Sequence, residues 1–131
     1  MKYLFTLVAC AAISVLVACG AGHPTIVSLL VNPQNSQATV PNGEVGFTAT
    51  GTFTNNQSRE LTATDGLKWS TSDPSIASIG SNTGQATCLA VGTVTITAEA
   101  PADLSFEINN GVHNSSSNVS GTASLQCVVT P

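Results

Sequence analysis

The most reactive side chains of this 131-residue chain belong to four cysteines and two histidines. They are Cys10, Cys19, Cys88, Cys127, His23 and His113. A serine nucleophile needs a histidine base, and neither histidine has a Gly-x-Ser-x-Gly turn nearby. A structural zinc site needs four Cys or His ligands, and a catalytic one needs three protein ligands and a water. The sequence therefore predicts no enzyme active site, no metal site and no bound cofactor.

The first two cysteines lie in an N-terminal segment with the composition of an export signal. Lys2 supplies a short positive start, and an almost unbroken apolar run extends from Tyr3 to Ala18. A membrane-spanning helix needs roughly 20 apolar residues, and the glycines and proline of residues 20–24 end this run too early. We therefore expect residues 1–18 to be a cleaved signal peptide and not a retained membrane helix.

The end of the apolar run, Leu16-Val17-Ala18-Cys19, resembles the lipobox of bacterial lipoproteins. The resemblance implies that Cys19 is lipidated and becomes the mature N-terminus, with residues 19–24 as a lipidated tether that holds the protein on a membrane. Cys10 ends a similar pattern, but cleavage there leaves only about six apolar residues, fewer than the roughly 7 to 15 of a signal peptide. We favour Cys19, and the alternative is a buried thiol in an ordinary signal peptide.

The residue after Cys19 bears on the destination of such a lipoprotein. In many Gram-negative bacteria an Asp at that position signals retention in the inner membrane, and this chain has Gly20. The resemblance therefore implies a lipid-anchored protein of the cell envelope. The outer membrane or cell surface is the preferred location, and the periplasmic face is the alternative.

Charge argues against one class of partner. Beyond Cys19 the only basic residues are Arg59 and Lys68, whereas the seven acidic residues of the chain all lie there. Phosphate binding needs clustered Lys and Arg side chains. We expect no nucleic-acid partner.

Residues 25–131 have the pattern of short strands joined by turns. Apolar residues alternate with threonine and glycine, and Gly, Pro, Asn and Asp recur at intervals of about ten residues. This pattern predicts an all-β sandwich or barrel of about seven strands, with Trp69 in its core. The extended segments expected are 25–32, 45–53, 61–62, 67–70, 76–79, 85–91, 93–99 and 123–129.

The order of these features resembles the bacterial Ig-like group 2 domain. The residues that carry the resemblance are Phe47–Phe53, Arg59–Thr62, Trp69–Ile79, Gly84–Thr87 and Gly92–Ala98. It extends from about Thr25 to Ala100 and resumes at Gly121. The resemblance implies an immunoglobulin-like β-sandwich of the kind found in surface and adhesion proteins, and it implies no catalytic chemistry.

The sequence departs from that family between residues 101 and 120, where a short connection is usual. Loops of this length are usually functional or disordered. If this one is functional, Phe106 and His113 are the expected anchors of a contact loop at one end of the sandwich. The alternative is an inert loop.

The two remaining cysteines have the phase of buried strand residues. Cys88 is in phase with Ala86 and Ala90, and Cys127 is in phase with Leu125 and Val129, so both are expected to point inward. Disulfides persist in exported proteins, and we expect a bond between Cys88 and Cys127. The alternative is a pair of buried free thiols.

Together these features predict a non-enzymatic, lipid-anchored module of the cell envelope that serves surface adhesion or protein assembly. The membrane is its expected partner through the lipid on Cys19, and any protein or glycan ligand is unidentified. Two alternatives stay open. One is a carbohydrate-binding Ig-like domain that uses the 101–120 loop, and the other is an inert structural spacer.

Overall fold

The computed structural model describes residues 22–104 and 117–131, and within them the secondary structure is strand and turn. One short 3-10 helix, η1 (Ala63–Asp65), is the only helix in these ranges. The strands are β1 (Ile26–Asn32), β2 (Asn35–Val40), β3 (Glu44–Gly46), β4 (Thr48–Phe53), β5 (Ser58–Leu61), β6 (Lys68–Thr71), β7 (Ala77–Ile79), β8 (Gln85–Cys88), β9 (Gly92–Pro101) and β10 (Asn118–Val129).

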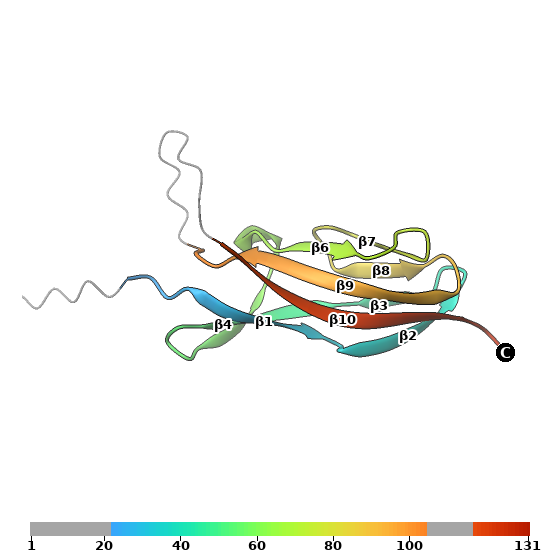
Figure 1. Cartoon of the computed structure of the whole chain (residues 1–131), viewed down its shortest axis with the longest axis horizontal. Helices are drawn as coiled ribbons and strands as arrows, with labels where there is room; N and C mark the ends of the chain where they lie inside the picture. The colour runs from blue at the N-terminus through green and yellow to red at the C-terminus, as the bar shows by residue number, and fades with distance from the viewer. Residues whose placement is uncertain (1–21, 105–116) are drawn as a thin grey trace, which may run out of the picture.

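The strands form two layers of an Ig-like β-sandwich (Figure 1). One layer is a four-stranded sheet in the order β2-β10-β9-β6. The other layer consists of two three-stranded sheets, β1-β4-β5 and β3-β8-β7, and only Phe47 separates β3 from β4. Strand pairing is antiparallel except between β2 and β10, which run parallel. The predicted fold class is confirmed.

The core lies between the two layers. All buried side chains among the described residues are apolar. Trp69 is 6% exposed, as its place in the pattern predicts, and its ring centroid lies 6.4 Å from that of Phe47. Gly84 lies against the indole of Trp69 and the backbone carbonyl of Phe47, and a Cβ atom there would come within 2.9 Å of the indole Cε2. Glycine at this position therefore allows the β7–β8 turn to close over the tryptophan.

The prediction of a single strand over residues 45–53 is wrong in one respect, because the structure has two strands there. The chain changes partners at Phe47, whose backbone N–H donates to the carbonyl of Gly84 at 2.9 Å. The part before it, β3, pairs with β8, and the part after it, β4, pairs with β1 and β5. The alternation of apolar residues over 45–53 predicts one inward face that includes Phe47, Ala49 and Gly51, and these three residues are buried.

Two further boundaries differ from the sequence pattern. Strand β2 was not expected, because its sequence is mostly polar and only Ala38 is buried. Strands β9 and β10 also extend into the expected 101–120 loop, since β9 ends at Pro101 and β10 begins at Asn118. Antiparallel pairing of Asn118 with Pro101 and of Ser120 with Glu99 accounts for this extension.

Candidate functional site at the entry end

The structure contains the Cys88–Cys127 disulfide that the strand phase predicts. Cys88 comes from β8 in one layer and Cys127 from β10 in the other, with 5.6 Å between their Cα atoms. The two residues are 0% and 1% exposed. The bond therefore joins the layers inside the core, where it stabilises the sandwich and offers no thiol chemistry to a partner.

Three sequence-predicted functional residues, Cys19, Phe106 and His113, lie outside the described residues, and so does Cys10. Their roles stay predictions. His23 is described and is exposed just before β1. Within residues 22–104 and 117–131, no group of three or more His, Cys, Asp or Glu side chains is placed to hold a metal ion.

Several backbone hydrogen bonds define one end of the sandwich, which we call the entry end. It comprises residues 22–25, the β4–β5 turn (residues 54–57), residues 102–104 and Ser117. Thr54 N donates to Thr25 O at 2.9 Å, Ile26 N to Ala102 O at 2.7 Å, and Ala102 N to Ser117 O at 2.9 Å. The N-terminal residues and both boundaries of residues 105–116 therefore meet at this end (Figure 1).

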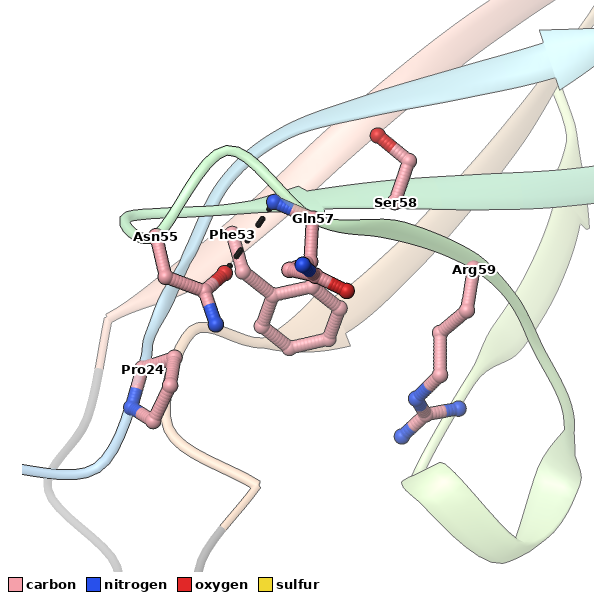
Figure 2. A pocket seen from close by; sticks show the side chains of 6 residues that line it. All are labelled: Pro24, Phe53, Asn55, Gln57, Ser58 and Arg59. Atoms are coloured by element: carbon pink, nitrogen blue, oxygen red, sulfur yellow. Dashed lines mark hydrogen bonds between the residues drawn. The ribbon is translucent and has the colours of Figure 1, made fainter.

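The β4–β5 turn has a fixed conformation because its polar groups bond to one another. Phe53 N donates to Gln57 O at 2.8 Å, and Gln57 N donates to the side-chain Oδ1 of Asn55 at 3.1 Å. Asn56 has a φ of 61°, in the left-handed region that asparagine tolerates better than most residues. Oδ1 of Asn55 is engaged in the turn, so its Nδ2 group points toward Pro24 (Figure 2).

A hollow of about 280 Å³ lies beside this turn, and we call it the Phe53 pocket. The Phe53 ring forms one wall and packs on its inner side against the core. Figure 2 shows the other side chains around it, which come from the segment before β1, from the turn and from β5. They are Pro24, Asn55, Gln57, Ser58 and Arg59.

An ion pair positions the one cation of the pocket. Arg59 Nη1 donates to Asp65 Oδ2 at 2.9 Å and Nη2 to Asp65 Oδ1 at 2.7 Å, and the guanidinium carbon lies 5.6 Å from the Phe53 ring centroid. The bond from Arg59 holds the pKa of Asp65 below its ordinary value, and the Asp65 bond raises the pKa of Arg59. The two charges of the ion pair cancel. Arg59 therefore gives the pocket N–H donors without giving it a net positive charge.

Sequence reasoning missed this pocket. The alternation over residues 45–53 predicts that Phe53 faces inward, which is correct for one side of its ring. Arg59 enters the sequence pattern only through the family resemblance. The one usable signal was the Asn55-Asn56 turn, which places planar amide groups next to the aromatic residue that ends β4. It does not show that Asp65 and Pro24 reach the same place.

A family model describes this architecture. The model of the bacterial Ig-like domain (group 2) matches residues 31–102, more than half of the chain. The chain belongs to this bacterial Ig-like family. Domains of the group 2 family are surface or structural modules of extracellular or surface proteins and are generally non-catalytic. Comparison with curated proteins gives no match.

The group 2 match covers the last two residues of β1, Val31 and Asn32, and every element from β2 to β9, and it ends at Ala102. It includes the Phe53 pocket except for Pro24, and it does not include β10 with Cys127. Among the described residues of this Ig-like chain, no helix has the length and apolar character needed to cross a membrane.

Proposed function

We propose that this group 2 Ig-like protein is a lipid-anchored, non-enzymatic module of the cell envelope that serves surface adhesion or protein assembly. The observation that carries the proposal is the position at which the chain enters the fold. Ile26 begins β1 at one end of an elongated sandwich, only a few residues after the lipobox-like sequence that ends at Cys19. An anchor there holds the whole domain by one end.

The distance to the membrane follows from the length of the tether. Each extended residue spans at most about 3.3–3.6 Å, so the six residues between Cys19 and Ile26 reach about 20 Å. A lipid on Cys19 keeps the entry end within that distance of the bilayer surface. The opposite end, with the β2–β3 and β8–β9 turns and the end of β10, then projects away from the membrane.

The projecting end supports the assembly part of the proposal. Leu89, Val91 and Val129 lie there and are 48%, 60% and 62% exposed. The pairing of Gly92 with Cys127 brings the β8–β9 turn next to the end of β10. Exposed apolar side chains that share one end of a domain gain free energy when a protein partner covers them.

Fractionation of the native host tests the anchor. Wild-type protein is expected in the membrane fraction and to need detergent for release, whereas Cys19→Ala is expected to lose membrane association. Cys10→Ala is the matched control, because it removes the other cysteine of the same apolar run and should leave the location unchanged. A Cys19→Ala protein that stays in the membrane fraction to the same extent as wild type contradicts the proposal.

The carbohydrate-binding alternative is favoured by one described feature, the Phe53 pocket. The sequence placed such a site on the 101–120 loop, but the pocket is formed by the β4–β5 turn, Arg59 and Pro24. The spacer alternative predicts that neither the pocket nor the projecting end has a ligand.

A further inference from the structure

We propose that the Phe53 pocket binds one neutral sugar unit of a glycan. The inference does not depend on the lipid anchor, because every residue in it belongs to the described sandwich and the segment before β1. It also differs from the loop site that the sequence suggests, since it includes neither Phe106 nor His113.

The Phe53 pocket combines an apolar wall with planar polar groups. A pyranose ring has apolar C–H faces and hydroxyl groups around its edge. The Phe53 ring provides a surface for the C–H groups. The Nδ2 group of Asn55 and the side-chain amide of Gln57 offer donors and acceptors to neighbouring hydroxyls. Small binding sites generally combine an apolar lining with a few polar groups of this kind.

Two of the polar side chains, Asn55 and Arg59, are held in place before any ligand arrives. The Asn55 side chain is fixed because its Oδ1 accepts a hydrogen bond from Gln57 N at 3.1 Å. Arg59 is fixed by two bonds to Asp65. Little side-chain entropy is therefore lost when a ligand binds, and preorganisation of this kind favours binding of small ligands.

The charges at the pocket disfavour anionic and cationic ligands. Asp65 neutralises Arg59, so an anion gains little from the guanidinium. The pocket lining itself carries no carboxylate, so a cation finds no charged ligand among its side chains. Asp65 accepts from two of the five N–H donors of Arg59 and Glu60 O accepts from a third, so a sugar hydroxyl can accept from the two that remain.

The size of the pocket limits the ligand to one sugar unit. Its volume of about 280 Å³ is just below the range of roughly 300–1,000 Å³ found for drug-sized ligands. A ligand of that size in an open, hydrated site binds weakly, and a dissociation constant on the order of 1 mM is expected. Such an affinity becomes useful when several anchored copies contact one glycan strand.

The test is a titration of isotopically labelled full-length chain, followed by NMR, with the methyl glycosides of glucose, galactose and N-acetylglucosamine. The detergent must have no sugar headgroup, because such a headgroup would compete for the pocket. At least one glycoside is expected to shift the amide signals of Asn55, Gln57 and Ser58 in a saturable way. If none of the three does so up to tens of millimolar, the proposal is wrong and the anchor proposal is unaffected.

Asn55→Asp is the most informative variant because it keeps the Oδ1 acceptor for Gln57 N and removes the Nδ2 donors. We expect it to weaken sugar binding by about 3- to 10-fold. Gln37→Glu makes the same change of charge on the exposed surface of β2, outside the pocket, and should alter binding less than about 2-fold. Equal affinities for Asn55→Asp and wild type would overturn the assignment of the pocket.

Phe53→Leu tests the aromatic wall separately. Leucine keeps most of the apolar volume on the core side of Phe53 and removes the ring face. A thermal melt first shows that the variant is folded, and the sugar-dependent shifts should then fall below detection. Unchanged shifts at Asn55 and Gln57 in the folded variant would exclude the ring as part of the site.

Discussion

Cys88 in β8 and Cys127 in β10 form a disulfide between the two layers of the sandwich, with 5.6 Å between their Cα atoms. The bond closes a loop with a sequence separation of 39 residues, which contains all of β9. Cross-linking across such a loop removes much of the conformational freedom of the unfolded chain. The group 2 match ends at Ala102, so this bond also attaches the last strand, β10, to the matched part.

Replacement of both cysteines by alanine should lower the free energy of unfolding by about 4 kcal/mol, as the chain-entropy account of a loop of this length gives. Alanine at both positions avoids leaving an unpaired thiol in the core. Denaturant unfolding of wild type under non-reducing conditions and of the double variant measures the difference. A difference below about 1 kcal/mol would show that the unfolded chain is already compact without the bond.

Substitution of Gly84 by alanine should destabilise the fold by about 3 kcal/mol. Gly84 has a φ of 70°, and a Cβ atom would come within 2.6 Å of Phe47 O and 2.9 Å of Trp69 Cε2. The cost combines a left-handed backbone, roughly 1–2 kcal/mol, with overpacking of roughly 1–3 kcal/mol. Gly22→Ala is the control, since nothing lies within 4 Å of a Cβ there, and should leave the midpoint of unfolding unchanged.

The Arg59–Asp65 ion pair should make the free energy of unfolding depend on pH in the acidic range. The pKa of Asp65 is lower in the folded protein, mainly because of the bond from Arg59, so the pair stabilises the fold above the ordinary pKa of an aspartate. That contribution is lost as the pH falls through the lowered pKa. The Arg59 side chain is 50% exposed, which limits the contribution to about 0.2–1 kcal/mol.

Urea unfolding of wild type and Asp65→Asn between about pH 6 and pH 2 measures this term. The variant should be less stable than wild type near pH 6, and the two curves should converge at low pH. Curves that keep a constant separation over the whole range would mean that ionisation of Asp65 has no part in stability.

Valine at position 71 should stabilise the protein by about 1 kcal/mol. The Oγ1 atom of Thr71 is buried and, within the described parts of the chain, has no hydrogen-bond partner. Burial of a hydroxyl without a partner costs about 1–3 kcal/mol, and valine has the same shape. Thr95→Val, on the exposed face of β9, is the control and should change stability by less than about 0.5 kcal/mol. A destabilised Thr71→Val would show that the hydroxyl is bonded.

Much of the fold could be predicted because its signals are local. Alternation along residues 45–53 and 93–99 places Phe47, Val94 and Ile96 on the inner face, since successive strand residues point to opposite sides. The same rule places both Cys88 and Cys127 inside. Their bond follows once the strands belong to facing layers and the protein is exported.

The parts that could not be predicted depend on contacts between distant segments. Strand β2 is polar and forms only because β10, almost ninety residues later, offers it a parallel edge. The break at Phe47 depends on the carbonyl of Gly84, and the Phe53 pocket depends on Asp65 and Pro24 reaching Arg59 and Phe53. Sequence periodicity does not indicate these long-range contacts, because each of them forms only in the completed sandwich.

The central claim is that Cys19 carries the lipid that anchors the sandwich. Intact mass spectrometry of protein from the membrane fraction, with and without reduction, tests it most directly. The account predicts a chain that begins at Cys19, carries the mass of a diacylglyceryl group, and gains two hydrogen atoms when the Cys88–Cys127 bond is reduced. An unlipidated chain that begins at any other residue would contradict it.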